Sequence, residues 1–203
     1  MKISFCITAY SRDIHLLDRL TDSILNQSEK PYEIILFCSE VADNSIISRI
    51  PDIKIITRVD RVMQSKARNI CSKVSSGDVL IFFDIDDIPH YQKIEVTSYL
   101  FNEYNPDFLL HSYSDVVHNN NIDKKLLDVR TNLKIDNTST NLYCDGFPIH
   151  HAHIAVKKDV FKKVRFNESL KAYRKEDGIF CQELIRNNFK GIYTPEKLVQ
   201  YNQ

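Results

Sequence analysis

Tryptophan is absent from the 203 residues, and glycine occurs only four times. So few glycines argue against a glycine-rich loop that cradles phosphates, and the polar residues Ser11-Arg12-Asp13 follow the first apolar segment instead. Neither sign of charge is in excess, because 27 Lys and Arg residues balance 27 Asp and Glu residues. This balance removes any global electrostatic argument for nucleic acid as a partner. No apolar run approaches the length that crosses a bilayer, so no transmembrane segment is expected.

The cysteines do not form the pattern of a disulfide framework. They are odd in number, widely spaced and mostly placed inside apolar runs: Cys6, Cys38, Cys71, Cys144 and Cys181. Such cysteines are typical of small buried hydrophobes in a reducing compartment. The amino-terminal segment 2–8 is too short and too quickly polar for a signal peptide. We therefore expect a cytoplasmic protein with one domain over residues 1–203.

The first 90 residues alternate short apolar runs with segments of helical periodicity. Strands are expected at residues 3–8, 33–38, 53–57 and 79–83, and helices at residues 13–26 and 65–74, the second capped by Ser65 and ended near Gly77. This order implies right-handed crossovers. It predicts an α/β fold with a mainly parallel central sheet, helices on both faces, and a nucleotide-binding half at residues 1–90.

The second half, residues 91–203, is less regular. Helices are expected at residues 92–104 and 176–187, and strands at 107–112, 153–156 and 197–201. Between them, residues 118–141 are polar and rich in Asn, Asp, Lys and Thr. A long loop of this kind is either a lid on the acceptor side or a solvated insertion, and the sequence leaves both open.

Three carboxylates follow the most apolar strand of the chain. The run Val79–Phe83 predicts a strand buried on both faces, and Asp84, Asp86 and Asp87 come directly after it. Ligands of open parallel sheets bind beyond the carboxyl ends of the strands. Several carboxylates placed together repel one another unless a cation neutralises them, and oxygen ligands favour Mg2+ or Mn2+. A purely structural role, in which an aspartate caps the next helix, would explain Asp87 alone.

Other polar residues fall at matching positions. Thr8 and Tyr10 follow the first strand, where a base could stack on the tyrosine ring. Lys66 and Arg68 open the helix before the acidic strand, where a phosphate would be favoured. Much later, Glu176-Asp177 begins another helix with a second pair of carboxylates. Two separate acidic centres suit a division of labour in which one holds a metal and the other accepts a proton.

With these motifs in order, the sequence resembles the family 2 glycosyltransferases of GT-A fold over nearly all its length. The motifs that carry the resemblance are Ile7-Thr8-Ala9-Tyr10, Lys66-Ala67-Arg68-Asn69, Phe83-Asp84-Ile85-Asp86-Asp87, the helix from Lys175-Glu176-Asp177-Gly178, and the tail Ile192–Tyr201. Each motif alone would be weak evidence. Their number, order and placement on the expected elements make the resemblance specific.

The resemblance implies roles for the acidic residues. Asp84 would contact the donor ribose, and Asp86 would coordinate Mn2+ or Mg2+ at the diphosphate. Asp87 would bind the metal through water or cap a helix. Asp177 would be the general base, with Glu176 beside it to bind the acceptor or hold the loop. The implied reaction is an inverting transfer of a sugar from a nucleotide-sugar donor, a UDP-sugar above all, to a hydroxyl group of a glycan, a lipid-linked molecule or a protein.

The implied donor site includes Arg68, with Lys66, Thr8 and Tyr10, and departs from the family at one position. The family commonly has an aspartate after the second strand for the uracil, whereas this chain has Ser39-Glu40, so these residues would have to substitute for it.

Two further departures concern the acceptor and the metal. Gly178 follows the Glu-Asp pair where the family often has tryptophan, and the family's metal-binding histidine after the closing strand has no counterpart here. His150, His151 and His153 are the candidates for a ligand from elsewhere. On a strand, His151 and His153 would share one face, and His151 is taken as a candidate metal ligand. Hydrogen bonding to backbone, or lining an acceptor pocket, is the common alternative for such histidines.

Two rival functions are weighed against this interpretation. A sugar nucleotidyltransferase would be expected to carry a glycine-rich, lysine-containing phosphate loop, which Ser11-Arg12-Asp13 replaces. A catalytically inactive nucleotide-sugar-binding module with the same fold would have no need of both acidic centres, and unused clustered carboxylates cost stability through repulsion.

Overall fold

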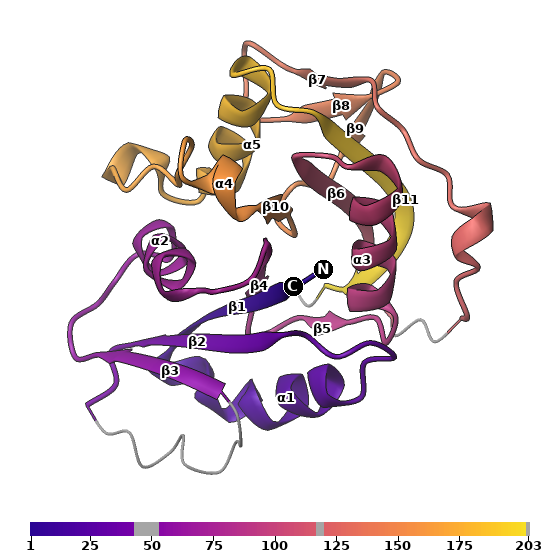
Figure 1. The fold of residues 1–203 in the computed structure, drawn as a ribbon. Coiled ribbons are helices and arrows are strands. Elements are labelled where there is room, and N and C mark those ends of the chain that lie inside the picture. The colour runs from indigo at the N-terminus through magenta and orange to yellow at the C-terminus, as the bar shows by residue number, and fades with distance from the viewer. Residues whose placement is uncertain (43–52, 117–119, 202–203) are drawn as a thin grey trace.

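An eight-stranded mixed sheet runs through the computed structural model, which describes residues 1–42, 53–116 and 120–201 (Figure 1). The strands lie in the order β3-β2-β1-β4-β10-β6-β11-β5. Their bounds are β1 Ile3–Tyr10, β2 Glu33–Ser39, β3 Ile53–Arg58, β4 Val79–Asp84, β5 Ile88–Pro89, β6 Phe108–Ser114, β10 Ala155–Lys157 and β11 Gly191–Gln200. Both halves of the chain therefore contribute strands to one sheet.

Six of these strands run in the same direction. β1 pairs in parallel with β2 and β4, and β2 pairs in parallel with β3. β10 is antiparallel to both β4 and β6, so β6 runs the same way as β4, and β11 is parallel to β6. The prediction of a mainly parallel sheet is confirmed. The carboxyl ends of β1, β4, β6 and β11 consequently lie along one edge of the sheet.

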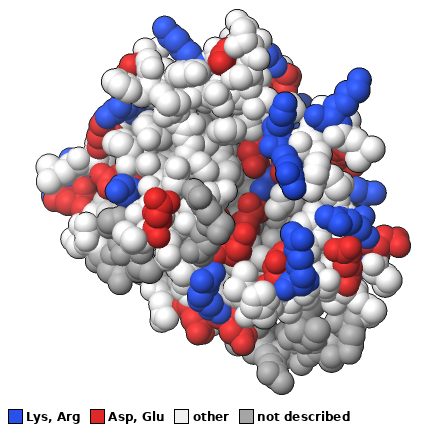
Figure 2. Space-filling model, turned by 180° about the vertical axis from the view of Figure 1, so that it is seen from behind, with Lys and Arg blue, Asp and Glu red and all other residues white. Residues whose placement is uncertain are grey.

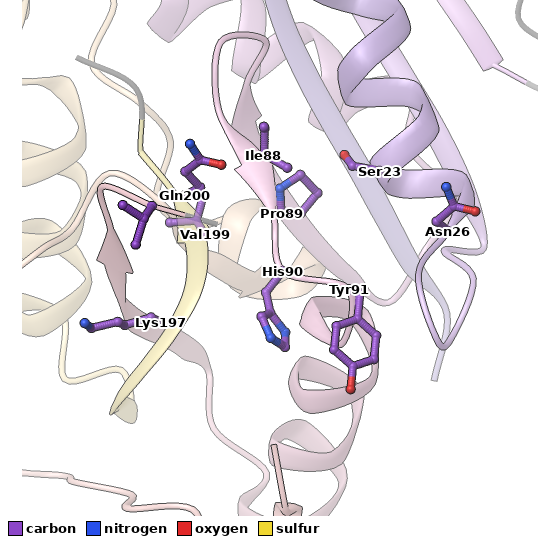
Figure 3. A pocket seen from close by; sticks show the side chains of 10 residues that line it. Ser23, Asn26, Ile88, Pro89, His90, Tyr91, Lys197, Val199 and Gln200 are labelled. Atoms are coloured by element: carbon purple, nitrogen blue, oxygen red, sulfur yellow. The ribbon is translucent and has the colours of Figure 1, made fainter. Parts of the chain in front are cut away.

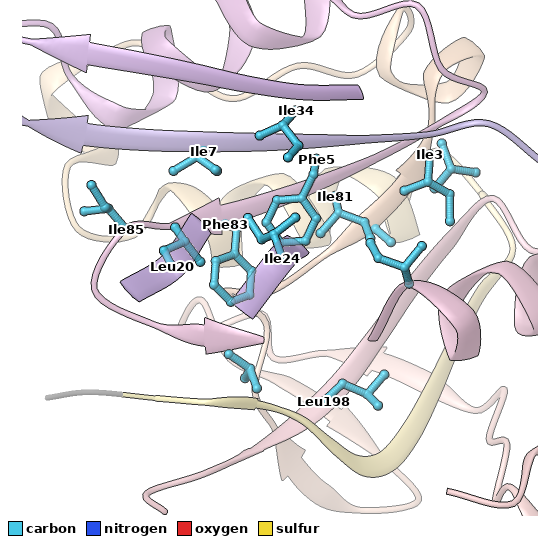
Figure 4. Packing of buried hydrophobic residues seen from close by; sticks show 14 of the residues in the cluster. Ile3, Phe5, Ile7, Leu20, Ile24, Ile34, Ile81, Phe83, Ile85 and Leu198 are labelled. Carbon is cyan, nitrogen blue, oxygen red and sulfur yellow. The ribbon is translucent and has the colours of Figure 1, made fainter. Parts of the chain in front are cut away.

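Helices cover both faces of the sheet, as expected (Figure 1). Their bounds are α1 Leu17–Leu25, α2 Gln64–Val74, α3 Lys93–Tyr104, α4 Lys158–Phe161 and α5 Glu176–Arg186. Successive residues of β1 point to opposite faces: Phe5 and Ile7 pack in one core with α1 and α3, while Cys6 packs in the other with α2, α4 and α5. Figure 4 shows the first of these cores, in which Phe5 and Phe83 lie beside Leu20 and Ile24 of α1.

β4 is buried on both faces, as its unbroken apolar run predicts. Ile81 and Phe83 belong to the core on one face, and Leu80 and Phe82 belong to the core on the other. The Phe82 ring lies 5.3 Å from that of Phe161 and 5.1 Å from that of Phe166 between centroids. Apolar side chains on both faces fix β4 in the sheet, so the polar residues after it are held at the sheet edge.

Some local predictions in the first half are wrong. The helix expected at 13–26 is a 3-10 helix at Ser11–Leu16 followed by the shorter α1. Ser65 is not a cap, because α2 begins at Gln64 and Met63 occupies the cap position without a side-chain hydrogen bond. The segment after Asp87 is the short strand β5 rather than the start of a helix, and β5 pairs with β11.

The second half holds more strands than its sequence predicts. Part of the polar stretch 118–141, of which 118 and 119 lie outside the described residues, forms a 3-10 helix at Lys124–Leu126 and then β7 at Leu133–Ile135. β7 pairs with β8 (Leu142–Cys144), which pairs with β9 (Phe147–Ile149), in a small antiparallel sheet. The closing strand β11 begins at Gly191, six residues before the predicted 197. β10 begins only at Ala155, so the three histidines precede it and the alternation argued for them on a strand does not apply.

Candidate active site

Arg68 of α2 is the centre of a buried group of charges. Its side chain is 1% exposed, and Nη2 donates to both carboxylate oxygens of Asp84, at 3.0 and 3.2 Å. Nη1 donates to Oδ1 of Asp177 and lies 3.7 Å from Oε1 of Glu176. We call these four residues the Arg68 cluster. Carboxylates from two distant parts of the sequence, Asp84 and the adjacent pair Glu176 and Asp177, thus converge on one guanidinium.

The elements that carry these residues explain why they meet. Asp84 is the last residue of β4, and Glu176 and Asp177 form the first turn of α5, where the helix dipole favours negative charge. Ala67, next to Arg68 on α2, is buried in the core beneath the same face of the sheet. The Arg68 guanidinium also lies over the Phe166 ring, 5.2 Å from its centroid.

The cluster holds more negative than positive charge. Burial raises the pKa of Asp177 to about 7 against the opposing effect of Arg68, and the charges of Asp84 and Glu176 add to the rise. The carboxylates in turn raise the pKa of Arg68, against the effect of its burial. Two buried atoms, Arg68 Nε and Glu176 Oε2, have no hydrogen-bond partner within the described ranges. A buried polar atom without a hydrogen-bond partner, next to a carboxylate with a shifted pKa, is typical of a functional site.

Asp84 also receives hydrogen bonds from two residues outside the Arg68 cluster, Thr8 and Gln64. Thr8 Oγ1 donates to Asp84 Oδ1 at 3.2 Å, and Gln64 Nε2 donates to the same oxygen at 3.3 Å. The structure therefore joins Thr8 to the Arg68 cluster.

Two guanidinium groups lie over the ring of Tyr10, at the end of β1. Arg12 is 5.6 Å and Arg61 is 5.3 Å from the centroid of its ring. Arg61 was missed in the sequence, where an isolated arginine after β3 gives no signal. Two cations beside an aromatic ring at this edge favour an anionic, ring-bearing ligand.

Ser39, Glu40 and Lys66 lie outside the Arg68 cluster. The Ser39 hydroxyl donates to the carbonyl oxygen of Asp60 at 3.2 Å and accepts from the Val62 N–H at 2.7 Å, so it fastens the loop after β3. Glu40 is exposed and has a positive φ of 63°, and Lys66 is exposed on α2.

The two carboxylates after Asp84 have opposite environments. Asp86 is exposed, whereas Asp87 is 1% exposed and its Oδ2 lies 2.6 Å from Nε2 of His153. Loss of hydration and then repulsion from Asp87 and Asp84 raise the pKa of Asp86 to about 6. Asp86 therefore presents its carboxylate at the surface of the turn, whereas Asp87, the residue predicted to bind the metal through water or to cap a helix, is turned inward.

His153 belongs to a buried chain of polar side chains below the turn. His150 Nε2 lies 3.0 Å from His153 Nδ1, and the His153 ring stacks with that of His111 at 6.0 Å between centroids. His111 in turn contacts the buried amine of Lys93 through Nε2. Burial lowers the pKa of Lys93 to about 7. This network ties the acidic turn to α3 and β6.

His151 lies against the start of α5. A Cβ atom added at Gly178 would stand 2.7 Å from its Nε2 and 2.5 Å from the carbonyl oxygen of Thr140. The backbone around Gly178 therefore has no room for the tryptophan that the resemblance suggests at this position. No group of three His, Cys, Asp or Glu side chains suited to a metal is present in the part of the chain that the structure describes, so His151 and Asp86 do not form a complete cage.

A single exposed carboxylate is still compatible with the binding of a hard cation such as Mg2+. Mg2+ and similar ions are commonly held by one or two carboxylates together with substrate phosphates rather than by an all-protein cage. The oxygen chemistry of Asp86, its exposure and its raised pKa suit such a shared site. The backbone of Asp86 is also fixed, because Arg19 Nη2 donates to its carbonyl oxygen at 2.7 Å.

The surface around the site carries both signs of charge. On the face shown in Figure 2, Lys and Arg side chains alternate with Asp and Glu side chains, and acidic side chains line a hollow near the middle. A separate pocket of about 180 Å3 lies between α1, β5 and β11 (Figure 3). It is lined by Ser23, Asn26, Ile88, Pro89, His90, Tyr91, Val116, Lys197, Val199 and Gln200. No member of the Arg68 cluster lines this pocket, so it is not part of the candidate active site.

Comparison with known proteins identifies the family. The profile of the family described as glycosyl transferase family 2 matches residues 4–165. The chain belongs to this family. No curated protein sequence matches the chain.

The fold agrees with family 2 membership. TarS of S. aureus, residues 1–349, superimposes with a TM-score of 0.73 at 15% identity, covering 98% of this chain and 59% of that TarS chain. The mannosyltransferase PcManGT of Pyrobaculum calidifontis superimposes with a TM-score of 0.67 at 14% identity, covering 96% of this chain and 55% of that protein. These likenesses show the GT-A fold. This family 2 chain spans less than two thirds of the length of either protein.

None of the helices within residues 1–42, 53–116 and 120–201 is long and apolar enough to cross a membrane.

Proposed function

We propose that this family 2 chain carries the catalytic site of an inverting, metal-dependent glycosyltransferase that moves a sugar from a nucleotide-sugar donor, a UDP-sugar above all, to a hydroxyl acceptor. The observation that carries the proposal is the Arg68 cluster, which holds Asp177, a carboxyl with a pKa of about 7, next to the last residue of β4. Residues 1–90 would bind the nucleotide, and residues 91–203 the acceptor.

The donor would lie along the carboxyl ends of β1 and β4. Tyr10, with the Arg12 and Arg61 guanidiniums near its ring, would stack on the base, and Asp84, held by Thr8 and Arg68, would bond to the ribose. Ser39 and Glu40 lie at the end of β2, where the base edge would need a partner. Because the Ser39 hydroxyl is engaged by the loop after β3, Glu40 and backbone groups are the better candidates for that contact. The positive charge of Lys66 at the start of α2 would attract the diphosphate.

Asp86 would hold Mn2+ or Mg2+ together with the diphosphate oxygens. When bound, the cation would stabilise the negative charge that develops on the leaving nucleoside diphosphate. Two similar structures support the choice of ligands: one of TarS is described as a complex with UDP-GlcNAc, and that of PcManGT as a complex with GDP-Man and Mn2+.

Asp177 would accept the proton of the acceptor hydroxyl. The hydroxyl oxygen forms a bond to the anomeric carbon, while the bond from that carbon to the phosphate oxygen breaks on the opposite face. Because Oδ1 of Asp177 accepts from Arg68, Oδ2 is the oxygen that takes the proton. Oε2 of Glu176, which has no hydrogen-bond partner among the described residues, can accept a bond from a second acceptor hydroxyl.

Replacing Asp86 by alanine is expected to abolish the gain in nucleotide-sugar affinity that Mn2+ provides. The carboxylate is the exposed protein oxygen of the acidic turn, so its loss removes the protein's hold on the cation. Calorimetric titration of the donor with and without Mn2+ measures the effect, with Asp78→Ala, a change at an exposed aspartate before β4, as the control. An unchanged Mn2+ dependence in Asp86→Ala would contradict the metal assignment.

The rate of sugar transfer is expected to decrease as the pH drops below about 7. The base form of Asp177 is its carboxylate, and a pKa raised to about 7 means that this form is lost as the pH drops through 7. At saturating Mn2+, kcat/KM should decrease roughly ten-fold for each further pH unit. Initial rates of nucleoside diphosphate release between pH 5 and 9 test this. A flat profile down to pH 5 would remove Asp177 from the role of base.

A further inference from the structure

Three aromatic rings gather at the carboxyl-end edge of the sheet, on the side of β4 opposite to Tyr10. Tyr113 is near the end of β6, Tyr201 directly follows β11, and His150 follows β9. The ring centroids of Tyr113 and His150 are 4.6 Å apart, and that of Tyr201 lies 5.4 Å and 5.5 Å from these two. All three side chains are partly exposed. We call them the aromatic triad.

The sheet topology places the aromatic triad beside the acidic turn. β4, β6 and β11 run in the same direction, and β10 between β4 and β6 starts at the edge where they end. Ring contacts agree with this placement. The Tyr201 ring lies 6.0 Å from that of His153 between centroids, and His153 Nε2 lies 2.6 Å from Oδ2 of Asp87 in the turn.

His150 is held in place within the triad by a hydrogen bond. Its Nε2 is hydrogen-bonded to Nδ1 of His153, which contacts Asp87 of the same turn. The triad is thus a partly exposed aromatic surface anchored to the site, rather than an isolated surface patch.

A sugar ring matches this surface chemically. A pyranose presents C–H groups on one face and hydroxyls around its rim. The faces of aromatic rings carry partial negative charge that attracts such C–H groups, and tyrosine hydroxyls add hydrogen bonds at the rim. Ligand sites are commonly lined by aromatic side chains with a few polar groups of this kind. In a chain without tryptophan, tyrosine and histidine are left to supply a stacking surface of this kind.

We infer that Tyr113, His150 and Tyr201 form a carbohydrate-binding subsite that stacks against a pyranose ring beside the acidic turn. The inference rests on the proposed function, because that function places a sugar next to the turn. The ring belongs either to the donor sugar or to a sugar of the acceptor, and the two sources give different results below.

The test uses variants that remove one ring at a time from the full chain. Tyr201→Ala and Tyr113→Ala delete a stacking surface, and Tyr201→Phe keeps the ring while removing its hydroxyl. Tyr32→Ala is the matched control, because Tyr32 is 52% exposed and precedes β2 at the opposite edge of the sheet. Thermal unfolding of each variant checks that it is folded at the temperature of the binding measurements.

The donor arm compares nucleotide sugars with the bare nucleotide. UDP and a panel of UDP-sugars that includes UDP-GlcNAc are titrated in the presence of Mn2+ by calorimetry. If the subsite takes the donor sugar, Tyr201→Ala and Tyr113→Ala weaken binding of the preferred UDP-sugar about ten-fold and leave UDP binding unchanged. Tyr201→Phe retains most of the affinity, and Tyr32→Ala retains all of it.

The acceptor arm uses methyl glycosides and saturation-transfer NMR. If the subsite takes an acceptor sugar, at least one glycoside shows transfer to the C–H groups of one ring face in the parent protein. That signal is lost in both alanine variants and kept in Tyr201→Phe and Tyr32→Ala, while UDP-sugar affinity is the same in all of them.

The inference is overturned if both alanine variants equal the parent in both arms. A different result would contradict the proposed function and still support the carbohydrate subsite. In that case the parent protein binds neither UDP nor any UDP-sugar, yet it shows glycoside contacts that depend on Tyr113 and Tyr201.

Discussion

Replacing Asp177 by asparagine is expected to lower the rate of sugar transfer by at least about 100-fold while donor binding survives. Asparagine has the shape of aspartate and still offers Oδ1 to the Arg68 guanidinium, but it cannot take a proton from the acceptor hydroxyl. The donor contacts proposed for Tyr10 and Asp84 remain. Steady-state release of nucleoside diphosphate measures the rate, and calorimetry with the donor and Mn2+ measures binding.

This substitution is a clean test because the fold should tolerate it. Asp177 shares one guanidinium with Asp84 and Glu176, and its burial together with their charges makes its own ionised form costly. Asparagine removes one of the mutually repelling charges and keeps the hydrogen bond, so thermal stability should not fall.

The matched control for Asp177→Asn lies on the same helix. Glu183 of α5 is 44% exposed and forms an ion pair of 2.9 Å with Arg186 on the surface. Glu183→Gln should therefore leave transfer and stability nearly unchanged. Equal transfer rates for Asp177→Asn and the parent protein would show that the proton leaves by another route.

Much of the fold could be predicted because the first half of the chain follows local rules. Its strands are mainly apolar, and the unbroken apolar run of β4 predicts burial on both faces. Their alternation with helices then predicts a mainly parallel sheet. Where a strand end carries a run of carboxylates, as at Asp84, the sequence also indicates which edge of the sheet carries the site.

The parts that could not be predicted depend on partners far away in the sequence. Nothing local to the acidic turn distinguishes the carboxylate that faces outward from the one that turns inward. Asp87 is buried because His153, 66 positions later, bonds to it. Likewise the pattern places Lys93 on a helix, and the fold brings its buried amine into contact with His111 of β6.

The short strands β7, β8 and β9 were missed for a similar reason. A strand of three residues is too short to show an alternation of apolar and polar residues. The formation of these strands depends on their pairing with one another, and side-chain propensity does not encode this pairing.

Removing the Arg68 guanidinium is expected to cause the largest loss of stability of any single change in the site. Arg68→Met keeps most of the volume but leaves Asp84, Glu176 and Asp177 together without their shared cation. Breaking a buried ion pair from one side costs about 3–5 kcal/mol of unfolding free energy. Chemical denaturation at pH 8 measures the loss. Arg186→Met, which breaks an exposed pair of the same kind, should cost less than about 1 kcal/mol.

The pH dependence of this loss separates a charge effect from a packing effect. Without Arg68 nothing opposes the effects of burial and of the neighbouring negative charges on Asp177, so its folded-state pKa, already about 7, rises further above the unfolded value of about 4. Between these values the folded protein binds more protons than the unfolded chain, so the free energy of unfolding of Arg68→Met increases as the pH falls. The difference from the parent protein should therefore shrink between pH 8 and pH 5. A difference that stays constant over this range would mean that Arg68 stabilises the fold through its contact with Phe166 and not as the counter-charge of the candidate catalytic carboxylates.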